Sequence, residues 1–240
     1  MKVSIATNSI EIKKHLQTIK DYIYAVSISI DGIGYVNDSF RNYPGLFEKV
    51  TEAIKLLNEH NVRMCVSTVI WDGNKNQLED IVKFVKENGV SQINFSYLVP
   101  AGRATNDKIH INFNDYKVIS EEFERKKSKY NSDNFQVLFR RSHKLDGKSI
   151  DCEGGKKIIH IDGYGNIYPC SWCAKIKDNK SFSAQWNGNN MNECFNKIRQ
   201  LNEIIKKRKE QLGYSGCPAM AYLYYKDLYS NDPLNILLER

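Results

Sequence analysis

The sequence predicts an α/β fold in which a series of parallel strands and helices is followed by a small α+β part containing a β-hairpin. Apolar runs of strand length alternate with helical patterns through residues 1–98, and this alternation then stops. After residue 150 the chain shows a hairpin pattern and carries five of its six cysteines. Strands separated by one helix are βαβ units, whose strands run parallel.

The first part contains four predicted strands and the helices between them. The strands are expected at residues 3–9, 25–30, 63–70 and 92–98, and the helices at residues 11–21, 46–60 and 76–89. In the last helix, Asn76 is the predicted N-cap, Glu79 follows as in a capping box, and Gly89 lies just past the end. Because the first strand begins almost at Met1, we expect an exposed sheet edge unless other elements cover it.

The second part has a different pattern. A charged helix is predicted at 115–130 and a short strand at 135–139. The segments KKIIHID and GNIYP flank the turn DGYG as a hairpin, and a long helix at 190–213 ends at Gly213. We therefore expect three regions: 1–107 with the βαβ units, 108–145 as a connecting helix and strand, and 146–240 as the small cysteine-bearing domain.

Composition excludes some classes of protein. The hydrophobic fraction of 41% and the charged fraction of 26% are ordinary for a globular chain. No apolar run approaches membrane-span length, and the N-terminus lacks a signal-peptide pattern, so we expect a cytoplasmic protein with no membrane partner. The net charge of +7 is spread among acids in segments such as EIIKKRKEQ. Such segments are typical of solvated helix faces, so we expect no nucleic-acid partner.

The cysteines around the hairpin predict a metal site. Cys152 precedes the first hairpin strand, and Cys170 and Cys173 follow the second. Because a hairpin returns its two ends to the same place, we expect these thiols to be neighbours. Cys217, in the segment SGCPAMAY, is the fourth candidate. Four thiolates satisfy either tetrahedral zinc or a [4Fe–4S] cube, and the spacing alone does not choose between them.

The two remaining cysteines are expected to be structural. Cys65 lies within a predicted strand, where a thiol acts as a small apolar side chain. Cys194 lies on a predicted helix beside Phe195 and is interpreted in the same way, although it is the alternative to Cys173 as fourth ligand.

Several segments together resemble a known family. In chain order they are ATNS (6–9), SISIDG (27–32) followed by NDSFR (37–41), TVIWDGNKNQLEDI (68–81), LVPAGRA (98–104), CEGGKKIIHIDGYGNIYPC (152–170) and GCPAMAY (216–222). Their order and spacing resemble the radical SAM enzymes with a C-terminal SPASM or twitch auxiliary-cluster domain. This group contains peptide-modifying maturases and anaerobic sulfatase maturases.

The resemblance implies a fold, cofactors and site residues. The fold would be a partial (β/α)6 barrel whose four strands are the last four of six, followed by the SPASM/twitch-like domain. Ser29 would contact the ribose of S-adenosylmethionine, and Arg41 its carboxylate. An auxiliary [4Fe–4S] cluster, with zinc as the alternative metal, would be held by Cys152, Cys170, Cys173 and Cys217. The substrate would be a peptide or a protein.

The sequence also departs from the family pattern. The C-x3-C-x2-C motif that holds the SAM-cleaving cluster does not occur in the 240 residues, nor does the G-G-E motif. We therefore expect a truncated chain, one half of a split enzyme completed by another polypeptide, or a degenerate relative, none competent for SAM cleavage alone. Whether the chain is an enzyme stays open, and no catalytic residue is predicted. The alternative is a non-enzymatic binding module with a structural zinc site of four cysteines.

Overall fold

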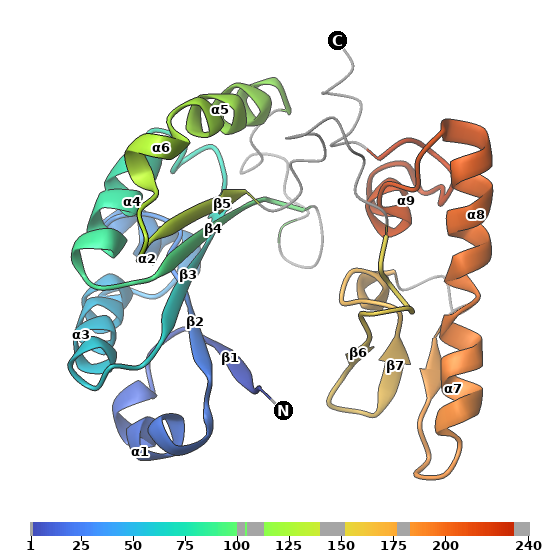
Figure 1. Ribbon diagram of the computed structural model, residues 1–240, viewed down its shortest axis with the longest axis horizontal. Helices are drawn as coiled ribbons and strands as arrows, with labels where there is room; N and C mark the ends of the chain where they lie inside the picture. Colours follow the sequence, from blue (N-terminus) through green and yellow to red (C-terminus); the bar gives the residue numbers. More distant parts are fainter. Residues whose placement is uncertain (1, 100–103, 105–112, 140–151, 177–182, 233–240) are drawn as a thin grey trace. The chain divides into compact units, whose positions relative to one another are not determined.

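The computed structural model describes residues 2–99, 104, 113–139, 152–176 and 183–232. These residues form two compact units, one built on a five-stranded sheet and the other on a three-stranded sheet (Figure 1). The α/β class predicted from the alternating pattern is confirmed. Among the described residues, no helix combines the length and the apolar character that crossing a bilayer requires.

The sheet of the first unit is entirely parallel, and its strands follow one another in chain order. The strands are β1 (Ser4–Thr7), β2 (Ala25–Ser29), β3 (Met64–Ile70), β4 (Gln92–Tyr97) and β5 (Gln136–Phe139). The sheet has one strand more than the four predicted. The extra strand is the short run at 135–139, which pairs in parallel with β4 and places Val137 beside Ile93.

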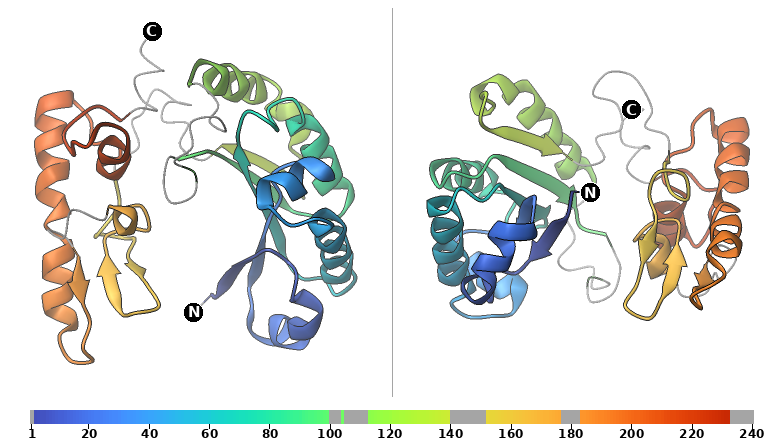
Figure 2. Two further views of the ribbon diagram at one scale, coloured as in Figure 1. Left: turned by 180° about the vertical axis from the view of Figure 1, so that it is seen from behind. Right: turned by 60° about the horizontal axis from the view of Figure 1, so that its bottom comes forward.

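Helices lie along the outer side of this curved sheet (Figures 1 and 2). They are α1 (Ile12–Tyr22), α3 (Leu46–Glu59), α4 (Leu78–Glu87), α5 (Phe113–Arg125) and α6 (Lys127–Tyr130), and the short α2 (Tyr35–Arg41) follows β2. The predicted helix at 115–130 is thus two helices that begin at Phe113. In α3 the buried positions Val50, Ile54 and Leu57 share one face, as the helical period predicts.

The two faces of the sheet differ in character. On β3, Val66 and its alternate neighbours are fully buried, whereas Ser67 on the opposite face is half-buried. Parallel register places Ser29, Ser67 and Asn94 in one row. A sheet covered by helices on one side needs apolar residues only on that side, which is why small polar side chains line the other.

Helix α4 begins two residues later than predicted. Its N-cap is Gln77, with no side-chain capping bond, so the prediction of Asn76 as the cap is wrong. The preceding turn is organised by Asn74 instead, whose Oδ1 accepts the Trp71 N–H at 2.9 Å. Because the turn closes on Asn74, the helix starts only after it. Gly89 follows the helix with a φ of 77°, as its predicted role as a helix terminator requires.

The second unit contains the predicted hairpin and a third strand. Strands β6 (His160–Ile161), β7 (Asn166–Tyr168) and β8 (Ala184–Gln185) form an antiparallel sheet. The hairpin turn is held by the Asp162 carboxylate, which accepts the Tyr164 and Asn166 N–H groups at 2.9 Å. The hairpin prediction is confirmed, and it brings the chain on either side of the turn together.

The long helix predicted at 190–213 is two helices, α7 (Met191–Ile198) and α8 (Leu201–Leu212). Between them, Gln200 N–H bonds to Lys197 O, and Asn202 N–H bonds to Arg199 O. These bonds span three residues instead of four and tighten the chain into a turn. Helix α8 ends at Gly213, which has a φ of 77° as predicted for a terminating glycine. Helix α9 (Pro218–Tyr225) follows.

Candidate metal centre and strand-end site

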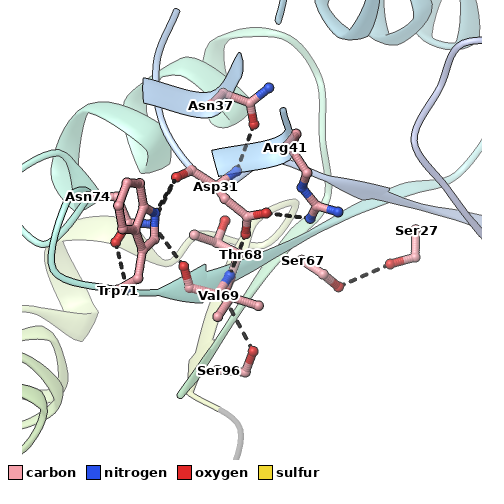
Figure 3. Close-up of polar contacts among 10 residues, drawn as sticks. All are labelled: Ser27, Asp31, Asn37, Arg41, Ser67, Thr68, Val69, Trp71, Asn74 and Ser96. Carbon is pink, nitrogen blue, oxygen red and sulfur yellow. Dashed lines mark hydrogen bonds and ion pairs between the residues drawn. The ribbon is translucent and has the colours of Figure 1, made fainter. Parts of the chain in front are cut away.

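The first candidate site lies where β2 and β3 end, around Asp31. The Asp31 side chain is fully buried; its Oδ1 accepts the Val69 N–H at 2.7 Å, and its Oδ2 forms an ion pair with Arg41 of α2 (Figure 3). Its backbone is also engaged, since the Asp31 carbonyl accepts hydrogen bonds from Trp71 Nε1 at 3.1 Å and from Asn74 Nδ2 at 2.9 Å. Asp31 thereby joins the ends of neighbouring strands.

Burial has the largest effect on the charge of Asp31 in its ion pair with Arg41. Removal from water raises the pKa of Asp31, and the Arg41 cation and the Val69 N–H oppose that rise. Arg41 is predicted to bind the SAM carboxylate, but in the structure its ionic partner is Asp31. Its side chain keeps 30% of its surface exposed, and its Nε is buried without a hydrogen-bond partner among the described residues. Its role toward SAM stays a prediction.

Ser29, the other predicted SAM contact, is the last residue of β2. It is half-buried and lies opposite Ser67 in the register of the sheet. The hydroxyls of Ser27 and Ser67 are 3.1 Å apart on the same face, which is therefore a polar surface. The PAGR segment of the predicted LVPAGRA motif lies outside the described residues. The sequence assigns Asp31 no individual role, and its link to Asn74 is not predicted; the available signal is a polar residue after each of two adjacent strands.

The second candidate site is the cysteine cluster of the second unit. Cys173 is buried at the start of a 3₁₀ turn (Cys173–Lys175), and its Sγ lies 3.6 Å from the Sγ of Cys170. Cys152, Cys170 and Cys217 pack against the apolar cluster that contains Cys173. The contact with Cys170, burial, and the proximity of the Cys217 and Cys152 thiols all raise the pKa of Cys173. The structure thus brings the four predicted ligands to one small core.

The two flanking cysteines, Cys152 and Cys217, are each fixed by a hydrogen bond from the backbone N–H to a side chain. The Cys152 N–H donates to Ser215 Oγ at 2.9 Å, and the Cys217 N–H donates to Asp232 Oδ2 at 2.8 Å. These bonds tie the start of the hairpin segment to the loop before α9, although 63 residues separate Cys152 from Ser215. No local pattern in the sequence signals such a long-range contact.

The other two cysteines lie elsewhere. Cys194 is buried on α7 in a separate cluster with Ile167 and Ile198, and its thiol faces the Gln185 carbonyl at 3.5 Å. Cys65 is half-buried on β3 in the first unit. Of the two alternatives for the fourth thiol, Cys173 is therefore the one that lies with Cys152, Cys170 and Cys217.

The chemistry of this cluster fits a metal that prefers sulfur. Within the described ranges, no three His, Cys, Asp or Glu side chains already have metal-binding geometry. The donor set nevertheless suits such a metal, because four cysteines pack at one small cluster and thiolates are the ligands that soft metals prefer. The 3.6 Å Sγ separation is near the ~3.8 Å expected between thiolates on one tetrahedral ion with Zn–S of about 2.3 Å.

Sequence comparisons give several relatives, although no protein-family model matches the chain. An AdoMet-dependent heme synthase of Methanosarcina barkeri is 24% identical over 97% of this chain and 74% of its own length. The subtilosin biosynthesis protein AlbA of Bacillus subtilis is 28% identical over 71% of this chain, which spans only 38% of AlbA. A cysteine-type anaerobic sulfatase-maturating enzyme of Clostridium novyi is 30% identical over 38% of this chain and 26% of its own length.

Solved structures share the fold. SuiB of Streptococcus suis matches with a TM-score of 0.67 at 13% identity, covering 85% of this chain and 51% of SuiB. The enzyme anSMEcpe with bound AdoMet matches with a TM-score of 0.66 at 16% identity, covering 99% of this chain and 71% of anSMEcpe. The parallel sheet followed by a small cysteine-bearing domain defines the class of fold. These relatives and structural neighbours agree with the resemblance to radical SAM enzymes of the SPASM group that the motifs give.

Proposed function

We propose that Cys152, Cys170, Cys173 and Cys217 hold an auxiliary [4Fe–4S] cluster in a radical SAM protein of the maturase type. The packing of the four cysteines against one apolar cluster carries this proposal. When bound, such a cluster supplies a one-electron carrier or an anchoring point for substrate. The chain's own part is to present the thiols from the two ends of a hairpin and from the start of α9, and to shield them with the apolar side chains around Cys173.

The first unit is proposed to contribute to SAM binding. The Ser29 hydroxyl, on the polar face of the sheet, would contact the ribose. Arg41, whose side chain is 30% exposed and is held by Asp31, would bind the carboxylate. Because the sequence has no C-x3-C-x2-C, we propose that SAM cleavage requires cysteines supplied outside these 240 residues. Relatives and structural neighbours, which include a structure of anSMEcpe with bound AdoMet, support a SAM-dependent role.

The proposed substrate is a peptide or protein. Support comes from AlbA, named for subtilosin biosynthesis, from the anaerobic sulfatase-maturating enzyme, and from the structure of SuiB bound to the precursor peptide SuiA. A second candidate is a tetrapyrrole. The heme synthase match favours it because that alignment covers 97% of this chain, and an Fe-coproporphyrin III synthase also matches over 77%.

Iron and sulfide analysis under anaerobic conditions tests the metal centre, combined with EPR of the reduced protein recorded with and without SAM. About four irons per chain are expected. They should be lost in a Cys170→Ala/Cys217→Ala variant and retained in Cys194→Ala, whose thiol lies in the other cluster. Stoichiometric zinc with no iron would contradict the proposal and favour a structural zinc site in a binding module.

A titration with Fe-coproporphyrin III distinguishes the two substrate classes. Saturable binding to the cluster-loaded protein, followed by a shift of the porphyrin absorption band, would favour the tetrapyrrole. If the porphyrin absorption band is unchanged when protein and porphyrin are present in equal amounts, the tetrapyrrole is excluded and a peptide or protein is favoured as the substrate.

A further inference from the structure

A buried arginine lies behind the cysteine cluster. Arg208 on α8 is fully buried, although it belongs to the charged run KKRKE. It occupies the same helix face as the buried Leu201 and Ile205, at spacings of seven and three residues. Charged side chains are almost never fully buried unless their partners compensate for the lost hydration, so this position calls for a physical reason.

Arg208 binds one loop through three backbone carbonyls. Its Nε donates to Ser215 O at 2.5 Å, and its Nη1 donates to Leu228 O at 2.5 Å and to Ser230 O at 2.6 Å. The planar guanidinium is suited to such a fork of donors. The bonds fasten both ends of the segment 215–230 to α8, and this segment contains Cys217 and helix α9.

The same loop holds the two flanking cysteines. Ser215, whose carbonyl Arg208 binds, uses its hydroxyl to accept the Cys152 N–H at 2.9 Å. Asp232, just past the loop, accepts the Cys217 N–H at 2.8 Å. Ser215 therefore links Arg208 to Cys152, because it bonds to both residues. Arg208 also bonds to both ends of the loop that carries Cys217.

The guanidinium also keeps its positive charge next to the loop that carries Cys217. Its three bonds go to neutral carbonyls, and its Nη2 is buried without a hydrogen-bond partner in the part of the chain that the structure describes. That Nη2 would lie 3.3 Å from a Cβ built on Gly216, the residue before Cys217. The anionic or ionisable groups in its field are Asp232, Tyr214, the Cys217 thiol and Asp227, in decreasing order of effect. Four thiolates on a divalent core carry net negative charge, which a buried cation stabilises.

We infer that Arg208 is a positioning residue of the metal centre. It holds the loop that orients Cys152 and Cys217, and its buried positive charge stabilises the thiolate-bound metal. This inference rests on the proposed metal centre and applies whether the metal is an iron–sulfur cluster or zinc.

Two variants and one matched control test the inference. Arg208→Met removes the charge and the fork of donors, whereas Arg208→Lys keeps the charge alone. Lys207→Met makes the same change of charge at the neighbouring exposed position of α8. Metal-free, reduced protein is titrated with Co²⁺, and the thiolate-to-cobalt absorption reports the binding. The reduction potential of the reconstituted iron–sulfur protein is measured in parallel.

We expect Co²⁺ binding to be about 10- to 100-fold weaker in Arg208→Met, the usual effect of losing a residue that orients metal ligands. The reduction potential of the cluster that still assembles should shift to a more negative value. The reduced cluster carries more negative charge than the oxidised one, so it loses more stabilisation when the Arg208 charge is removed. Arg208→Lys should keep the reduction potential of the unchanged protein but bind Co²⁺ more weakly. Lys207→Met should match the unchanged protein in both the reduction potential and the Co²⁺ affinity.

The possible outcomes distinguish a failure of the role inferred for Arg208 from a failure of the proposed metal centre. Wild-type affinity and potential in Arg208→Met would overturn the inference and leave the metal centre standing. Weaker binding at an unchanged potential would overturn the electrostatic role. Absence of both Co²⁺ binding and iron–sulfur reconstitution in the unchanged protein would overturn the metal centre itself, and the inference with it. If Arg208→Met does not fold, Ser215→Ala decides, because it removes the acceptor of the Cys152 N–H while leaving the carbonyl that Arg208 binds, and it should weaken Co²⁺ binding in the same direction.

Discussion

The carboxylate of Asp31 accepts the backbone N–H of Val69 at 2.7 Å, so a side chain at the end of β2 completes the hydrogen bonding of β3. Its second oxygen pairs with Arg41. The strand ends at the polar face of the sheet are therefore held by one buried charge and its partner.

Removal of Arg41 should leave this buried carboxylate without its cation. We expect Arg41→Met to lower the free energy of unfolding by about 2 kcal/mol at pH 7, somewhat below the range for fully buried pairs because Arg41 is part-exposed. Urea unfolding measures the change, with the exposed Arg199→Met as the control.

The loss in Arg41→Met should depend on pH. Burial raises the pKa of Asp31 above its ordinary value of 3.8, and without Arg41 the pKa rises further. A raised carboxyl pKa means that the folded state binds the proton more tightly than the unfolded chain, so stability falls as pH rises through that window. The deficit of the variant should therefore shrink as the pH falls from 7, because the variant takes up the proton on Asp31 at a higher pH than the unchanged protein does. A deficit independent of pH would contradict a role for the Asp31 charge.

Asn74 and Asn76 form a matched pair. Asn74 is fully buried and donates to the Val69 carbonyl at 2.8 Å and to the Asp31 carbonyl at 2.9 Å, whereas Asn76 is exposed. We expect Asn74→Ala to cost about 2–3 kcal/mol, because it leaves buried backbone groups unsatisfied. Asn76→Ala should change the free energy of unfolding by less than about 0.5 kcal/mol. Equal costs in chemical denaturation would restore Asn76 as the helix cap.

The hairpin turn should depend on the ionised Asp162. Its side-chain bond to Asn166 and the N–H groups of Asn166 and Tyr164 lower the pKa of this carboxyl. A lowered pKa stabilises the fold above the unfolded value and loses that contribution as pH falls through the folded one. Asp162→Asn should therefore destabilise the second unit at pH 7, and the difference should narrow as the pH falls below the ordinary carboxyl pKa of 3.8. Amide exchange of the hairpin measures it, and a difference that widens in acid would refute the explanation.

Alanine variants of Cys173 and Cys194 should distinguish a metal ligand from a cysteine that only packs in the core. Cys173→Ala should abolish stoichiometric metal binding, while Cys194→Ala should keep the metal and cost about 1–2 kcal/mol for a small buried cavity. Metal analysis and thermal unfolding of the two variants check both parts. Metal loss in Cys194→Ala alone would make Cys194 the fourth ligand.

The sequence alone determined the class of fold and most of the candidate metal centre. The apolar period of 46–57 predicts α3, and the turn DGYG predicts the hairpin that brings Cys152 near Cys170. These features follow from local patterns, because periodicity reports which side of an element is apolar and a hairpin needs only its own turn.

Only the tertiary structure decided the partners of the polar groups. The strand β5 joins the sheet through pairing with β4, the turn before α4 closes on Asn74 through a contact 43 residues away, and Arg208 is buried within a run that is typical of a solvated face. Cys173 and not Cys194 lies with the other thiols for the same reason. A local pattern records the burial of a face, whereas a hydrogen bond or a thiol contact depends on segments that meet only when the chain is folded.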